Sequence, residues 1–129
     1  MDVTLGPWIL AKGVDKEYKP LAAVMGDEAW KTVSDTSGFT PKEAVKGEPA
    51  AKGYTISGRI TTVLKEGNTV HIRSVFTVQV DGSFSTLKEV AGDGSVEGVP
   101  PEDALRPITK TRVSNILVAI KAGRVKKVR

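Results

Sequence analysis

The chain has 129 residues, of which 40% are hydrophobic and 26% are charged, values that are ordinary for one soluble globular domain. It contains no cysteine, which excludes disulfides, thiolate catalysis and cysteine-based zinc or iron–sulfur sites. The net charge is +4, and five of the basic side chains fall in the last nine residues, KAGRVKKVR.

The N-terminal third predicts a strand followed by helix. Apolar and polar residues alternate from Asp2 to Leu10, and Pro7 should confine this strand to a sheet edge or to irregular pairing. The opening MDVTLGPW lacks the basic and apolar regions of a signal peptide. From Asp15 to Val33 apolar residues recur at helical spacing, and Gly26 favours a helix in two pieces.

The next segment predicts a second, shorter helix. Thr40-Pro41-Lys42-Glu43 has the form of a capping box, with threonine before the helix, proline at its first position and glutamate at its third. We expect this helix to run to about Lys46 and to end at Gly47-Glu48-Pro49, because glycine and proline interrupt helices.

The stretch from Tyr54 to Val80 predicts a hairpin of two long strands around which the fold is organised. Glu66-Gly67-Asn68 supplies the positive backbone angles that a short hairpin loop needs. In the first arm one face is mostly apolar up to Leu64, and only Val63 breaks the alternation. In the second arm the apolar face includes Val70, Ile72, Phe76 and Val78.

After the hairpin we expect a weaker third strand, a loop and a final helix. The strand is predicted over 84–90 and the flexible loop over Gly92–Gly98, GDGSVEG. The helix opens at Pro100-Pro101-Glu102-Asp103 and ends before Gly123, with Pro107 either kinking it or marking its first turn. Its expected apolar face comprises Leu105, Ile108, Val113, Ile116, Leu117 and Ile120.

The expected fold is therefore α+β: an antiparallel sheet of three to four strands with helices packed on one face, including an amphipathic C-terminal helix. Residues 1–123 should form a single domain, and 124–129 a basic C-terminal tail. Trp8 and Trp30 are either core residues or anchors of an interface, and a core position is favoured.

The sequence predicts no catalytic, cofactor-binding or metal-binding residues. His71 is the only histidine, which excludes a histidine pair and leaves a single base for any triad. It lies with Arg59 and Arg73 on the expected outward face of the hairpin. Such a cationic face could bind nucleic acid, although stacking aromatic residues are missing from it. An exposed strand histidine is the preferred interpretation of His71.

The basic tail offers a second possible interaction site, formed by Arg124, Lys126, Lys127 and Arg129. Such a tail could meet phosphates or an anionic lipid surface. The favoured alternative is that it is simply solvated, as short charged termini usually are.

Two phrases carry a resemblance to a known group of proteins. AKGYTISGRITTV, with its Tyr-x-Ile-x-Gly strand, and DALRPITKTRVSNILVAI look like the strand and final helix of the small α/β domain of bacterial cell-envelope lipoproteins, in the group that includes curli-secretion and penicillin-binding-protein-activator proteins. The lipidated cysteine of that group is absent here. The resemblance implies a non-enzymatic periplasmic module that binds another envelope component or copies of itself.

Two functions are thus expected from the sequence. The first is a protein-binding or assembly module of the periplasm or cell envelope, whose partner is an envelope protein or a second copy. The alternative is a basic nucleic-acid-binding protein, which would favour a cytoplasmic location. Nucleic acid as a partner is the less favoured of the two.

Overall fold

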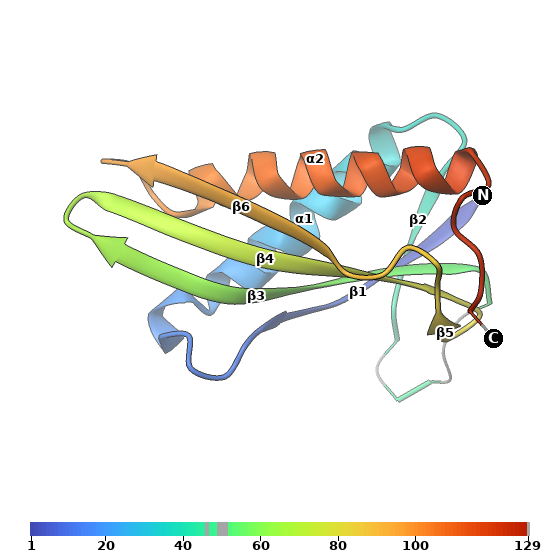
Figure 1. The fold of residues 1–129 in the computed structure, drawn as a ribbon, viewed down its shortest axis with the longest axis horizontal. Coiled ribbons are helices and arrows are strands. Elements are labelled where there is room, and N and C mark those ends of the chain that lie inside the picture. The colour runs from blue at the N-terminus through green and yellow to red at the C-terminus, as the bar shows by residue number, and fades with distance from the viewer. Residues whose placement is uncertain (46, 49–51, 129) are drawn as a thin grey trace.

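The computed structural model describes residues 1–45, 47–48 and 52–128. Two helices cover one face of a mixed sheet of six strands, and the other face of the sheet is open (Figure 1). The elements are β1 (Asp2–Leu10), a 3-10 turn (Lys16–Tyr18), α1 (Pro20–Asp35), β2 (Thr40–Glu43), β3 (Tyr54–Glu66), β4 (Thr69–Val80), β5 (Ser83–Phe84), β6 (Val90–Glu97) and α2 (Glu102–Lys121).

The α+β class and the placement of helices on one face are confirmed. The sheet is larger than the expected three to four strands, and it is not purely antiparallel. Its order is β2-β1-β3-β4-β5, with β6 also paired to β4. The strand β1 runs parallel to both of its neighbours, β2 and β3, because the helix-containing segments between them return the chain to the same end of the sheet.

β1 is confirmed as a strand. Of the two effects expected of Pro7, an edge position or irregular pairing, the structure shows irregular pairing. Leu5 pairs with Ile56 and Trp8 with Gly58, so two residues of β1, Gly6 and Pro7, stand opposite one of β3. Gly6 has a φ of 112°, which favours glycine. The extra residue turns the Trp8 side chain toward α1.

α1 is one continuous helix, and the expected break at Gly26 is wrong. The interruption comes earlier, at Lys19, where the 3-10 turn gives way to the helix that begins with Pro20. Gly26 lies within the helix, and the Trp8 indole packs directly against it. A Cβ built at Gly26 would lie 2.5 Å from Trp8 Cδ1.

The helix expected from Thr40 is also wrong. Residues Thr40–Glu43 form β2, paired in parallel with β1 from Asp2 to Leu5. The Thr40 N–H donates to the Met1 carbonyl over 2.8 Å, and the Ala44 N–H to the Leu5 carbonyl over 3.1 Å. These long-range hydrogen bonds outweigh the local capping preference. The expected end of that helix at Lys46 lies outside the described residues, as does Pro49.

The β3–β4 hairpin is confirmed, with one correction near its tip. Ile60 pairs with Ser74 but Thr62 with Arg73, so Thr61 is an extra residue. Such a bulge exchanges the two faces of the strand beyond it. Val63 therefore packs against the core, whereas Leu64 is 49% exposed and does not lie on the apolar face where the alternation predicts it.

The segment after the hairpin differs most from expectation. The predicted strand over 84–90 is reduced to β5, and the predicted loop Gly92–Gly98 is mostly the strand β6, antiparallel to β4. Gly92 and Gly94 occur there because α2 lies so close: a Cβ at Gly92 would stand 2.5 Å from Ile108 Cγ2. The glycines thus mark close packing rather than a loop.

α2 is confirmed, and its expected apolar face is buried throughout. Pro107 lies within the helix rather than at its first turn, since the helix begins at Glu102. Gly123 ends it with a φ of 73°. The Gly123 and Arg124 N–H groups donate to the carbonyls of Ile120 and Ala119, each over 3.0 Å, which is a Schellman motif.

The core lies between the sheet and the two helices. Its fully buried large side chains include Phe76, Met25, Ile56, Ile60, Ile72, Leu105, Ile116 and Leu117. Val125 belongs to the same cluster with 2% exposure, so the segment after α2 contributes to the core. Across the described residues, no helix is both long and apolar enough to cross a membrane.

Candidate functional site

The open face of the sheet carries the residues expected to form a cationic surface. Arg59 and Arg73 are exposed and His71 is half-buried. Arg73 Nε donates to Asp93 Oδ1 over 2.8 Å. His71 Nδ1 and Ser95 Oγ lie 2.6 Å apart and share a hydrogen bond. Since β6 lies beside β4, Asp93 of β6 neutralises one of the two arginines, which lowers the attraction of this face for phosphates.

The ion pair shifts the pKa values of both Asp93 and Arg73. The pKa of Asp93 lies below its ordinary value, chiefly because the carboxylate accepts a hydrogen bond from Arg73, with smaller contributions from the charges of Arg73 and Arg112. The pKa of Arg73 is raised, mainly by the same hydrogen bond. Both side chains are exposed, with about 60% of their surface accessible, so the pair is a surface feature.

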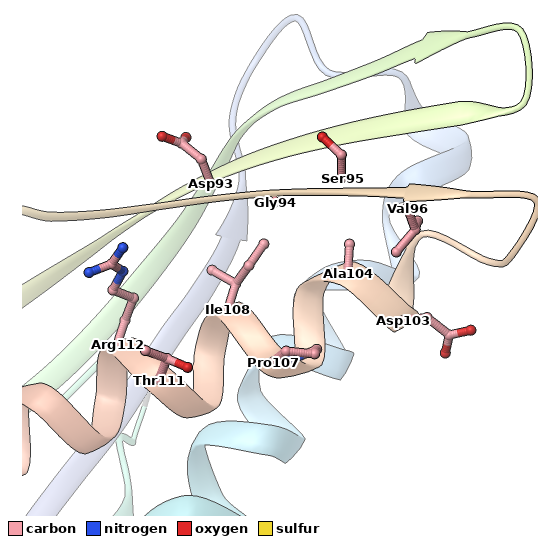
Figure 2. A pocket seen from close by; sticks show the side chains of 10 residues that line it. All are labelled: Asp93, Gly94, Ser95, Val96, Asp103, Ala104, Pro107, Ile108, Thr111 and Arg112. Atoms are coloured by element: carbon pink, nitrogen blue, oxygen red, sulfur yellow. The ribbon is translucent and has the colours of Figure 1, made fainter.

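A shallow cavity of about 340 Å³ lies where β6 meets the first half of α2. Figure 2 shows Ala104 and Ile108 pointing at the glycine side of β6, while Asp93 and Ser95 lie on the opposite side of the strand. Arg112 extends from α2 toward Asp93 (Figure 2). The strand thus separates the His71–Ser95 pair from the apolar part of the cavity, and the two do not form one reaction site.

The segment after α2 runs back along β5. Ser85 and Lys127 form an antiparallel bridge. The Thr86 N–H donates to the Lys126 carbonyl over 2.7 Å, and Thr86 Oγ1 donates to the Arg124 carbonyl over 3.0 Å. The side chains of Arg124, Lys126 and Lys127 are exposed, and their part in an interaction stays a prediction. Arg129 lies outside the described residues.

A larger, mainly apolar groove opens at the other edge of the sheet, with a volume of about 930 Å³. It lies between the second half of β1, the middle of α1 and the end of β2. We call it the tryptophan groove, and its main apolar residues are Pro7, Trp8, Ile9, Trp30, Ala44 and Val45. Several of these are exposed: Ile9 by 46%, Trp30 by 43% and Val45 by 59%.

The two tryptophans occupy different positions in the groove. Trp8 is half-buried, in a slot between Gly26 of α1 and Gly58 of β3. Trp30 lies on α1 beside the buried Ala29 but is itself 43% exposed. The preference for a core position is therefore met in part by Trp8 and is wrong for Trp30. No sequence signal identified the groove, because β2, which forms one wall, was predicted as a helix.

The charges around the groove are acidic. Among the described residues that line it, the charged ones are Asp27 and Glu43. Arg106 of α2 donates to Asp27 Oδ2 over 3.1 Å and to Glu28 Oε2 over 3.3 Å, so one guanidinium serves two carboxylates. In the described part of the chain, no cluster of three or more His, Asp or Glu could hold a metal ion.

Comparisons with known proteins identify the fold and no closer relationship. No protein-family model matches the chain, and no curated protein matches it. Solved structures do match. The hypothetical protein CT253 from Chlamydia trachomatis is 12% identical with a TM-score of 0.63, and the match covers 92% of this chain and 94% of that one.

Two further structures share the fold. The PelC dodecamer from Paraburkholderia phytofirmans is 12% identical with a TM-score of 0.62, covering 88% of this chain and 86% of that chain. A putative lipoprotein from Caulobacter crescentus is 11% identical with a TM-score of 0.50, covering 98% and 93%. At these identities the likeness is one of fold. One of these structures is described as a putative lipoprotein, and none of the three is described as a curli-secretion or penicillin-binding-protein-activator protein.

Proposed function

We propose that this chain is a non-enzymatic assembly module of the bacterial cell envelope, which works by binding further copies of itself. The observation that carries the proposal is the tryptophan groove. Monomeric proteins seldom leave a contiguous apolar surface with an exposed tryptophan in water, and such surfaces usually mark contact sites. Trp30, Ile9 and Val45 together form such a surface.

The composition of the groove supports contact rather than catalysis. Apolar side chains and backbone make up most of its lining, and general acid–base chemistry needs a titratable group placed against a substrate. His71 lies on the open face of the sheet with Ser95, and the groove is at the β1–β2 edge.

The fold comparison supports self-association within the envelope. PelC from Paraburkholderia phytofirmans is a dodecamer, and the Caulobacter crescentus protein is described as a putative lipoprotein. A domain of this fold is therefore able to assemble from identical copies. Closed, symmetric homo-oligomers are also the commonest assemblies of soluble proteins.

The experiment has a purified and a cellular arm. Multi-angle light scattering should give a mass that is several times 13.7 kDa and rises with concentration. Cross-linking in the source cells, followed by fractionation, should recover the same oligomer with the envelope. A monomer at all concentrations up to about 100 µM, together with recovery in the soluble cytoplasmic fraction, would contradict the proposal, because micromolar self-affinity already populates dimers there.

A nucleic-acid arm tests the alternative. Retention on DNA or RNA at 50 mM salt that falls steeply toward 200 mM would favour the basic-protein hypothesis over assembly. We expect little retention, because Asp93 already pairs with Arg73 on the sheet face.

A further inference from the structure

The sheet carries a second exposed apolar surface at the edge opposite the tryptophan groove. In the strand order, β2 and β1 stand at one end and β5 at the other. Phe84 of β5 is 73% exposed and Val128 is 46% exposed. Two apolar side chains are thus left exposed at this edge of the sheet.

Phe84 and Val128 lie side by side. The bridge between Ser85 and Lys127 places Phe84 directly opposite Val128, and the Val128 N–H donates to the Phe84 carbonyl over 2.9 Å. Residues opposite each other in an antiparallel pair point to the same side. Ser85, the next residue after Phe84, is buried and therefore points to the other side. Phe84 and Val128 project together into solvent.

The same geometry places positive charge around these two side chains. Val125 is buried with 2% exposure, and side chains alternate along an extended segment. Arg124, Lys126 and Val128 therefore turn away from the core together. We call Phe84, Val128 and Lys126 the Phe84 knob. It is an exposed apolar pair with a cation beside it.

The groove and the knob are complementary in polarity and in charge. The groove is apolar and its lining includes Glu43, whereas the knob is an exposed apolar pair with Lys126 beside it. Asp27, the other acidic residue of the lining, is already paired with Arg106. A volume of about 930 Å³ is within the range of pockets that enclose whole ligands. It can hold an aromatic ring with its neighbour. Such an anchor in an apolar pocket with a charged rim is the usual composition of an interface.

We propose that the Phe84 knob of one copy docks into the tryptophan groove of a second copy, with Lys126 facing Glu43. This inference rests on the proposed self-association and names its interface. The two surfaces are different and lie at opposite edges of one sheet, so the contact is heterologous. Each copy then offers a free groove and a free knob, and successive copies join head to tail into a ring or an open chain.

Two single variants and their mixture test the inference. Trp30→Glu removes the groove and Phe84→Glu removes the knob; both side chains are exposed, so the fold should survive. Each change should weaken self-association at least about thirtyfold, as for an interface hot spot. Leu64→Glu is the matched control, because Leu64 is also about half exposed, at 49%, and lies near the hairpin tip. It should leave the oligomer mass unchanged.

The mixture distinguishes a heterologous from a self-complementary contact. Trp30→Glu still carries an intact knob and Phe84→Glu an intact groove, so equal amounts of the two should form a 1:1 dimer that grows no further. Light scattering measures the mass, and circular dichroism melting confirms that each variant is folded. A mixture in which both variants stay monomeric would overturn the head-to-tail contact.

Charge reversal supplies an independent arm. Glu43→Lys or Lys126→Glu should each weaken assembly roughly two- to fivefold, the magnitude of an exposed ion pair. The double reversal should restore it. If the wild type assembles but Trp30→Glu and Phe84→Glu assemble equally well, this interface is refuted while the proposed function stands. If the wild type itself never assembles, the proposed self-association fails first.

Discussion

The Trp8 indole fills the space that a side chain at Gly26 would need: a Cβ there would lie 2.5 Å from Trp8 Cδ1 and 2.8 Å from Nε1. On the other side of the ring, a Cβ at Gly58 would meet Trp8 Cε3 at 2.9 Å. The indole is thus held between two glycines of different elements and cannot move away from either.

Gly26→Ala should therefore destabilise the protein, although alanine normally favours a helix by about 1 kcal/mol over glycine. We expect a loss of about 1–3 kcal/mol in the free energy of unfolding, as for overpacking, measured by urea denaturation. The same change in a Trp8→Val background is the control. There the clash is gone, and Gly26→Ala should be neutral or stabilising; an equal loss in both backgrounds would contradict the slot.

The contact between β6 and α2 predicts a difference between two glycines. A Cβ at Gly92 would meet Ile108 Cγ2 at 2.5 Å, whereas one at Gly94 would meet Cδ1, the flexible end of that side chain, at 2.6 Å. Gly92→Ala should lower the unfolding free energy by about 1–3 kcal/mol, and Gly94→Ala by less. Ala91→Ser, on the exposed side of β6, should change little.

The variant Ile108→Val separates the two contacts, because valine keeps Cγ2 and lacks Cδ1. In that background the cost of Gly94→Ala should fall and the cost of Gly92→Ala should remain. Both are read from urea midpoints. Equal costs in the two backgrounds would show that Ile108 does not limit the approach of the helix.

The ion pair on the open face predicts a pH effect. The pKa of Asp93 is lowered by Arg73 in the folded state, so the pair contributes stability above the ordinary carboxyl pKa of about 3.9. That contribution is lost as the pH falls through the lower, folded value. Arg73→Gln should raise the pKa of Asp93 toward its ordinary value in a carbon-13 NMR titration. Arg112→Gln should raise it less. An unshifted Asp93 in the wild type would contradict the pair.

The C-terminal segment predicts a contrast between neighbouring residues. Val125 is buried among core residues, and Tyr54 Oη donates to its carbonyl over 3.3 Å. Val125→Ala should cost about 1–3 kcal/mol through lost burial and the cavity left behind. Lys127→Ala, on an exposed side chain, should stay within about 0.5 kcal/mol. Equal stabilities in thermal or urea unfolding would indicate that the segment is solvated instead.

The parts of the fold predicted from the sequence are those where local pattern and tertiary packing agree. The hairpin and α2 have long apolar faces, and both are present. The expected face of α2 is buried throughout, and that of the hairpin is buried or half-buried except beyond the bulge, where Leu64 is exposed. The break in the alternation at Val63 was itself a sign of the bulge. Val63 lies two residues after the extra residue Thr61, which exchanges the faces of the strand and turns Leu64 outward.

The predictions that were wrong concern segments whose structure depends on partners distant in sequence. Thr40–Glu43 satisfies the local rules for a helix start, yet it pairs with β1. The glycines of Gly92–Gly98 indicate a loop locally, and only the approach of Ile108 explains them. The tryptophan groove needs β1, α1 and β2 together, so Trp30 alone could not reveal it. Of the predicted interaction residues, Lys126 lies beside the Phe84–Val128 pair.

The parallel pairing of β1 has a consequence for how the chain folds. Val3 pairs with Tyr54 and Asp2 with Thr40, so the first strand acquires both of its neighbours only from segments made much later. Contacts of such long sequence separation slow folding, because loop-closure entropy is lost before they form. We expect the β3–β4 hairpin and α2 to organise early. β1 would then enter the sheet late, together with β2, which joins the sheet through β1, and the half-built sheet edge would stay open to other chains until they do.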